Sequence, residues 1–377
     1  MRTAQFVWTE AGGWSPGLPP APDPSFQLVL AFGSASAFAR PELLAGLSRT
    51  FPSACLAGCT TAGEIHGATV RDDSLAATAV AFAHTRAEAA WVRVADHAGS
   101  REAGAALAAR LDPAGLRHVF VLSDGLAVNG SELVRGMAGS LPPGVGLTGG
   151  LAGDADRFRE TLVLADGRPQ AGAVTAVGLY GERLRVGYGS LGGWDPFGPE
   201  RVVTSSEGNV LHEMDGHCAL DLYKQYLGKH AEGLPATGLL FPLSIRQEGS
   251  RRRVVRTVLA VDEAGRSMTF AGDIPQGSYA RLMKANANGL VEGALGAARS
   301  ALAMGPASPA LAVLVSCVGR RMVLRQLAEE ELEAVRGACG PDAALTGFYS
   351  YGEISPFSDG VCELHNQTMT VTTFGEE

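Results

Sequence analysis

The sequence predicts an α/β protein with mixed sheets, built from repeated strand–helix–strand blocks and divided into two domains. Three times along the chain, a short apolar run is followed by an amphipathic helical stretch and by a second apolar run that ends in glycines. Two of these glycine turns share the pattern G-x-x-x-x-G-E-I, at residues 58–65 and 347–354. The irregular spacing favours an old duplication over a solenoid. A four-layer arrangement, with helices outside two packed sheets, would bury strands this short and apolar.

The first block follows a Gly/Pro-rich arm at residues 12–24, which is itself preceded by a candidate strand at 4–8. Residues 27–32 form an apolar run typical of a buried strand. Apolar residues at helical spacing then mark one face of a helix: Leu43, Leu44, Leu47 and Phe51. Residues 54–59 are predicted to be the strand that delivers the first turn, and a further strand is expected at 76–83.

The second and third blocks repeat this order. The second is predicted as a strand at 118–122, a helix at 131–137 and a strand at 145–147 that enters the turn at 149–154. The third is predicted as a strand at 311–315, a helix face of Leu324, Leu327, Leu332 and Val335, and a short strand at 344–345 before the second turn. Residues 369–374 close the chain as a strand.

A strand-rich region separates the second and third blocks, at residues 172–190 and 252–270, and its second part reads as a hairpin across 262–265. A short helix face at 220–227 precedes the glycine-containing segment 228–235, which is the expected domain boundary. A long helix rich in alanine and glycine is expected at 283–304, where a neighbouring element must pack closely.

Composition excludes several classes of protein. Of 377 residues, 46% are hydrophobic and 19% charged, so the chain can bury a core. The net charge of −8 argues against a general nucleic-acid binder. The six cysteines form no C-x-x-C pair, no secretory signal opens the chain, and no apolar run reaches the roughly 20 residues of a membrane helix. We therefore expect a soluble, cytoplasmic protein with no membrane contact.

Seven short segments, in order along the chain, carry a resemblance to the FIST family of bacterial sensory proteins. They are residues 58–65, 149–154, 193–199, 273–277, 316–320, 347–354 and 364–368. The resemblance spans roughly residues 25–375. It implies an N-terminal arm at 1–26, a FIST N-terminal domain at 27–218 and a FIST C-terminal domain at 219–377.

The resemblance also implies a function, because the family is inferred to sense small ligands and to signal to other proteins. This chain has no kinase, chemoreceptor or cyclase segment, so its output would pass to a separate histidine kinase or cyclic-dinucleotide enzyme. Some members that it resembles bind haem and report nitric oxide to a histidine kinase. A haem-based nitric oxide sensor, with haem b as cofactor, is therefore the alternative.

The second turn concentrates polar groups that suit a ligand such as an amino acid. Tyr349, Tyr351 and Glu353 would share one face of an extended segment, and His365 and Asn366 could pair beside them. The competing interpretation is that the tyrosines pack in the core and that Asn366 caps a loop.

Two residues outside the turn complete the predicted pocket, with Trp194 as rim or anchor and Arg320 as the cation. Arg320 follows a strand and could hold Glu353 or an anionic ligand, although a structural ion pair is equally consistent. Glu64, in the first turn, lacks the tyrosines, so we expect its carboxylate to bond loop amides and close the turn.

Two further hypotheses concern haem and catalysis. If haem is bound, His365 and His212 are the ligands to test first, since no C-x-x-C-H attachment site exists. A hydrolase or transferase could use Ser350 with His365 and Glu353, or Cys317 or Cys362, as nucleophile. No G-x-S-x-G elbow frames Ser350, which favours sensing over catalysis.

Overall fold

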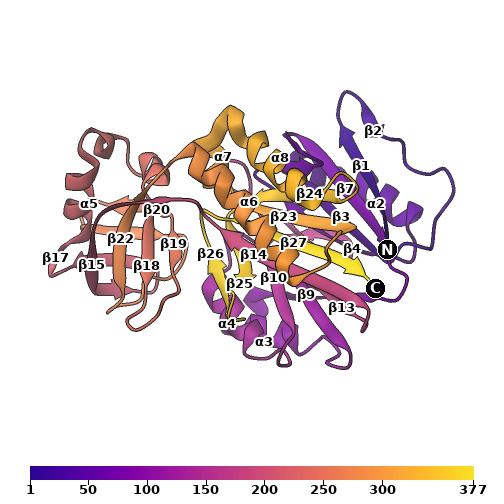
Figure 1. Cartoon of the computed structure of the whole chain (residues 1–377), viewed down its shortest axis with the longest axis horizontal. Helices are drawn as coiled ribbons and strands as arrows, with labels where there is room; N and C mark the ends of the chain where they lie inside the picture. The colour runs from indigo at the N-terminus through magenta and orange to yellow at the C-terminus, as the bar shows by residue number, and fades with distance from the viewer.

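The computed structural model describes residues 1–377 as two units (Figure 1). The larger, called the core unit, contains three mixed sheets of seven, six and six strands. The smaller, called the second unit, is segment 195–284 with one sheet of eight strands. Both termini lie in the core unit, where the amino group of Met1 pairs with Glu376 at 3.4 Å. The predicted mixed α/β fold with two domains is confirmed.

The core unit repeats one block three times, as the sequence predicts. In each block the first strand pairs in parallel with the strand after the helix and antiparallel with a later strand. The blocks are β3 (Leu28–Gly33), α2 (Pro41–Thr50), β4 (Cys55–Thr60) and β7 (Ser74–Ala81); β9 (Leu116–Ser123), α4 (Gly130–Ala138), β10 (Gly146–Leu151) and β13 (Ala173–Tyr180); and β23 (Leu311–Cys317), α8 (Ala328–Cys339), β24 (Ala344–Ser350) and β27 (Met369–Glu376).

Each central strand divides its side chains between two apolar cores. On β3, Leu30 and Phe32 enter a central core that also holds side chains from β9 and β23, whereas Val29 and Ala31 pack with α2. In the central core the ring centroids of Phe32 and Phe348 lie 4.8 Å apart. Burying each such large side chain contributes about 1.5–3 kcal/mol. Three sheets thus enclose one central core, and the helices lie outside them. The four-layer arrangement expected from the sequence had two sheets; the structure has three because each block supplies its own sheet.

The three sheets are interlocked by exchanged hairpins. The first block sends β5 (Glu64–His66) and β6 (Thr69–Arg71) to the third sheet, beside β24. The second sends β11 (Val163–Ala165) and β12 (Arg168–Gln170) to the first sheet, beside β4. The third sends β25 (Gly352–Pro356) and β26 (Cys362–His365) to the second, beside β10. No block therefore completes its sheet alone.

One glycine recurs at the same place in each block. The three glycines are Gly58, Gly149 and Gly347, which pair with Ala31, Val121 and Leu314, respectively, on the neighbouring parallel strand. A Cβ at any of the three would collide with that partner's carbonyl oxygen. The glycine of the repeated turn is therefore required by close backbone approach, whatever the turn binds.

Further elements complete the core unit. The arm contributes β1 and β2 to the edge of the first sheet, next to β7, and β14 pairs with β27 in the third. Their bounds, with those of the remaining elements, are β1 (Arg2–Thr9), β2 (Gly13–Ser15), α1 (Ala35–Phe38), β8 (Arg86–Arg93), α3 (Ser100–Ala108), β14 (Leu184–Leu191), α6 (Ala287–Met304) and α7 (Val318–Leu324). No helix is long and apolar enough to cross a membrane.

Of the two strand-rich parts that were expected, 172–190 belongs to the core unit as β13 and β14, and 252–270 belongs to the second unit. The β20–β21 hairpin of the second unit confirms the predicted turn at 262–265. The elements of this unit are β15 (Asp195–Glu207), β16 (Val210–Met214), β17 (His217–Cys218), α5 (Ala219–Leu227), β18 (Leu243–Arg246), β19 (Val254–Arg256), β20 (Val258–Asp262), β21 (Ser267–Phe270) and β22 (Tyr279–Lys284). The expected boundary at 218/219, and the segment 228–235, both fall inside this unit.

Two helix predictions differ from the structure. The helix expected from residue 283 begins at Ala287, because β22 occupies 279–284 and the Asn286 side chain then caps the helix. The helix expected across 324–335 is divided into α7 and α8 at Arg325, whose φ of 52° interrupts helical geometry.

Candidate functional site

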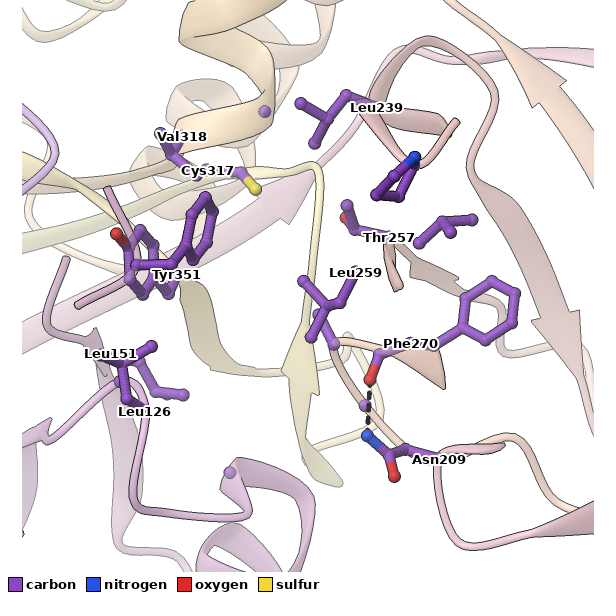
Figure 2. Close-up of a pocket in the computed structure, with 18 of the residues that line it drawn as sticks. Leu126, Leu151, Asn209, Leu239, Thr257, Leu259, Phe270, Cys317, Val318 and Tyr351 are labelled. Carbon is purple, nitrogen blue, oxygen red and sulfur yellow. Dashed lines mark hydrogen bonds between the residues drawn. The ribbon is translucent and has the colours of Figure 1, made fainter. Parts of the chain in front are cut away.

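A cavity of about 880 Å³ lies between the two units (Figure 2). Its core wall comes from the segment 125–130 that follows β9, the ends of β10 and β23, the start of α7, and Tyr351. Its other wall comes from β20, β21 and the segment 233–239 of the second unit. The cavity is thus at the carboxyl ends of parallel strands, where open α/β sheets bind ligands. Its volume lies within the usual range for small-molecule sites, about 300–1,000 Å³.

The mouth of the cavity exposes large apolar side chains. Sixteen of the 26 lining residues are hydrophobic. Half of the eight large hydrophobic residues that are strongly exposed in this chain line it: Leu126, Phe158, Leu259 and Met322, at 43%, 42%, 45% and 36% exposure. Such gathering of exposed apolar surface marks a place where a ligand or partner covers it.

Tyr351 is held in the wall by a strained loop. Its ring stacks on Phe158 with centroids 4.4 Å apart and planes 15° apart, and its hydroxyl donates to the carbonyl oxygen of Ala155 at 3.2 Å. Burial raises the pKa of Tyr351 to about 12, so the phenol is neutral. Ala155 and Phe158 both have positive φ, of 52° and 51°, a conformation that non-glycine residues adopt at a cost.

Few polar side chains line the cavity, and none is a cation. The Thr257 hydroxyl is buried and has no hydrogen-bond partner. Asn209 donates from Nδ2 to the carbonyl oxygen of Phe270 at 2.7 Å, which leaves its Oδ1 available (Figure 2). Asp156 is exposed at the mouth and forms no ion pair. The Asn209 Oδ1 and the Asp156 carboxylate are acceptors, the Thr257 hydroxyl can donate or accept, and the second N–H of Asn209 Nδ2 is a further donor.

The carboxylate of Glu353, expected in the pocket, is instead enclosed by its own turn. It accepts from Ser350 Oγ at 2.6 Å, from the Thr368 amide at 3.1 Å and from Thr368 Oγ1 at 2.9 Å. The side chain is fully buried and does not line the cavity. Its burial therefore keeps the carboxylate out of reach of a ligand in the cavity.

Glu64, in the first turn, is held in the same way. It accepts from Thr61 Oγ1 at 2.6 Å, from Ser74 Oγ at 2.6 Å and from the Ser74 amide at 3.2 Å. The expectation of a turn-closing carboxylate therefore describes both copies. The polar chemistry of the repeat holds the turn closed.

Arg320 lies behind the cavity wall, not in it. Its guanidinium is fully buried, pairs with Glu331 at 2.7 Å, and donates to the carbonyl oxygens of Gly192 and Leu290. Tyr349 is also fully buried, and its hydroxyl donates to Glu331 at 2.8 Å. The ion-pair interpretation of Arg320 thus describes the structure, with Glu331 and not Glu353 as partner.

The other predicted pocket residues also lie outside the cavity lining. Trp194 donates from Nε1 to the carbonyl oxygen of Gln367 at 2.7 Å. His365 faces the carbonyl oxygen of Ser355 through Nε2 at 2.9 Å, and burial lowers its pKa to about 4. Asn366 is buried with both side-chain polar atoms unpartnered. Among the seven predicted site residues, Tyr351 alone lines the cavity.

Family models match most of the chain. The FIST N domain model covers residues 27–217, and the FIST C domain model covers residues 219–356. The chain belongs to the FIST family. FIST domains are sensory domains of signal transduction proteins.

Other comparisons add little to this FIST assignment. No curated protein matches the chain. Among solved structures, a chorismatase matches with a TM-score of 0.36 at 11% identity, covering 98% of each chain. A cyanuric acid hydrolase from A. caulinodans matches with a TM-score of 0.22 at 12% identity, covering 78% of this chain and 68% of that one. These similarities are too low to assign an activity.

The residues expected to ligate haem in this FIST protein do not fit that role. An axial ligand needs a free ring nitrogen facing an apolar slot. His365 is buried and its Nε2 bonds the Ser355 carbonyl oxygen, and His212 is part of β16 in the second unit. Neither histidine lines the cavity. No haem chemistry is therefore derived for these residues.

The proposed nucleophiles are not paired with a base. Ser350 is fully buried and donates to Glu353, while His365 is turned to Ser355, so no Ser–His pair forms. Cys362 bonds to the carbonyl oxygen of Leu147 at 3.3 Å. Cys317 lines the cavity, but burial raises the pKa of its thiol, which disfavours the reactive thiolate.

The buried glutamates predict an unusual pH dependence of stability. Burial raises the pKa of Glu64 to about 7 and of Glu353 to about 8, so the folded chain holds protons that the unfolded chain has released. Stability therefore falls as the pH rises through these values. Burial of His118 and His365 lowers their pKa to about 3 and 4, which opposes this trend only below about pH 6.5.

We expect the free energy of unfolding to decrease between about pH 6.5 and 8, by up to about 1.4 kcal/mol per pH unit for each glutamate that is still protonated in the folded chain. Denaturant titrations at several pH values measure this slope. Glu353→Gln should flatten it above pH 7, and the exposed Glu333→Gln should leave it unchanged. A wild-type slope that survives Glu353→Gln would contradict the assignment.

Sequence reasoning missed the residues that build the cavity: Leu126, Asp156, Phe158, Thr257 and Leu259. One signal was present, since Leu126 follows a buried strand and a glycine, at the carboxyl edge where ligands bind. No comparable sequence signal marks Thr257 and Leu259. These residues belong to the second unit, and only the tertiary structure brings them opposite the core wall of the cavity.

Proposed function

We propose that this FIST protein senses a small ligand bound in the cavity between its units and passes occupancy to a separate signalling partner. The observation that carries the proposal is the cavity itself, whose walls come from both units and whose mouth exposes four large apolar residues. A ligand that bridges both walls changes the balance between open and closed arrangements of the units. The sensory role of FIST domains supports the same reading.

Arg320 offers a route from the cavity to the connection between the units. Val318 and Gly319, at the start of α7, line the cavity, and Arg320 follows them directly. Its guanidinium is bonded to Gly192 and Leu290, which flank the two chain crossings into and out of the second unit. A ligand that moves α7 would therefore displace both segments that connect the core unit to the second unit.

The partner is proposed to be a histidine kinase or a cyclic-dinucleotide enzyme, on the strength of the family. A cytoplasmic site of action is proposed as well. All six cysteines are free thiols, as a reducing compartment would keep them.

Thermal-shift screening tests the cavity as the sensing site. A small metabolite at a hundredfold excess over its Kd should stabilise the protein by about 2.7 kcal/mol. Ala127→Trp and Ala236→Trp, exposed residues on opposite walls, should fill the cavity and abolish the shift without unfolding the protein. Ala109→Trp, exposed on the core unit outside the cavity lining, is the matched control. Hits that survive both blocking variants would place the site elsewhere.

A further inference from the structure

The chemistry of the cavity lining restricts the ligand more closely than its size does. Among the lining side chains there is no lysine, arginine or histidine, and Asp156 carries the one charge. A bound carboxylate or phosphate would therefore lose its water without gaining an ion pair, which is costly. The side chains of the lining therefore favour a cation over an anion.

Three of the available polar groups can accept a hydrogen bond from a ligand that brings donors. Thr257 is 5% exposed, and its hydroxyl, inside the cavity wall, has no partner in the protein (Figure 2). The Asn209 Oδ1 and the Asp156 carboxylate are free acceptors. A buried hydroxyl without a partner costs about 1–3 kcal/mol, which a ligand donor would recover.

The apolar part of the lining suits a flat ring. Tyr351 and Phe158 present stacked aromatic rings at the core wall. Leu126 and Leu259 are exposed, one from each unit. Aromatic side chains favour offset or edge contacts with another ring, so a planar ligand gains contact area there.

We propose that the cavity binds an aromatic amine: a flat apolar ring that contacts Tyr351 and Phe158, with an ammonium group paired to Asp156 and a ring donor bonded to Thr257. This inference rests on the proposed function, because it names the ligand class of the same cavity. It departs from the amino-acid expectation, since an amino acid adds a carboxylate for which the lining holds no cation.

A neighbouring hollow of about 400 Å³ differs from the cavity in that cationic side chains line it. It shares Asp156, Val318 and Met322 with the cavity and is also lined by Arg321 and Arg325. The guanidinium of Arg321 is already bound to Asp72 at 2.6 Å and to the carbonyl oxygen of Ala62 at 2.6 Å. Arg325 is exposed to solvent and forms no ion pair, so it is the cation against which the proposal must be tested.

Three ligands with one ring system and different charges test the proposal by isothermal titration calorimetry at pH 7: tryptamine, 3-methylindole and indole-3-acetate. Tryptamine should bind about fivefold more tightly than 3-methylindole, the upper range for a partly exposed ion pair, and indole-3-acetate should bind most weakly. Asp156→Asn should remove the advantage of tryptamine and leave 3-methylindole unchanged. Asp342→Asn, an exposed aspartate outside the cavity lining, should change nothing.

Thr257→Val keeps the side-chain shape and should weaken both tryptamine and 3-methylindole about fivefold. Indole-3-acetate binding as tightly as tryptamine, and lost in Arg325→Ala, would overturn the amine class. Failure of all three ligands to bind would overturn it too. If Ala127→Trp still abolishes binding of indole-3-acetate, the cavity remains the proposed sensing site and only the amine class is overturned. Binding that is unchanged by Ala127→Trp and by Ala236→Trp would overturn both the cavity as the sensing site and the amine class.

Discussion

Replacing Arg320 with methionine should lower the free energy of unfolding by about 3–5 kcal/mol, the cost of breaking one side of a buried ion pair. Glu331 would be left as a fully buried, uncompensated charge. The carbonyl oxygens of Gly192 and Leu290 would lose their donors at the junction of the two units. Chemical denaturation followed by circular dichroism measures the change.

A double variant separates charge from packing. Arg320→Met combined with Glu331→Leu should recover part of the loss, because replacing both members of a buried pair with apolar residues is often tolerated. Recovery stays partial, since Tyr349 and Ser316 also donate to Glu331. A cost below about 1 kcal/mol for Arg320→Met alone would show that the pair does not hold the junction.

Replacing Gly347 with alanine should lower the free energy of unfolding by about 3 kcal/mol, at the upper end for overpacking. The added Cβ would collide with the carbonyl oxygen of Leu314, and a backbone atom cannot rotate away as a side chain can. Gly347 also pairs with Ile65 of the exchanged hairpin, so any shift is passed to the first block. Thermal unfolding and denaturant titration both report the loss.

Gly337→Ala is the matched control. This glycine lies within α8, and a Cβ there meets no atom within 4 Å. Alanine should stabilise the helix by about 0.5–1 kcal/mol, because it restricts the unfolded chain more than glycine does. Equal effects of the two substitutions would contradict the close-approach explanation for Gly347.

The repeated block was predictable from sequence because its signals are local. Apolar runs such as 27–32 and 311–315 identify central strands, and the glycines at 58 and 347 mark where strands approach closely. The hairpin exchange was not predictable. Thr346 pairs with His66 across most of the chain, and nothing within either segment specifies the other.

The candidate site was harder to predict, for a physical reason. Glu353 stands in a polar turn, but its hydrogen bonds to Ser350 and Thr368 are needed to fold that turn. Polar residues near a glycine therefore indicated structure as much as binding. Tyr351 lines the cavity, whereas the opposite wall, with Thr257 and Leu259, comes from a unit with no counterpart in the repeat.

The exchanged hairpins also set the order in which the protein can be completed on the ribosome. Strand β10 pairs on one side with β9, which is made just before it, and on the other with β25 at residues 352–356. The edge of β10 therefore stays unpaired while some two hundred further residues are synthesised. An open strand edge of this kind is a template for aggregation, so we expect nascent chains of this protein to be prone to aggregation until their final segment emerges.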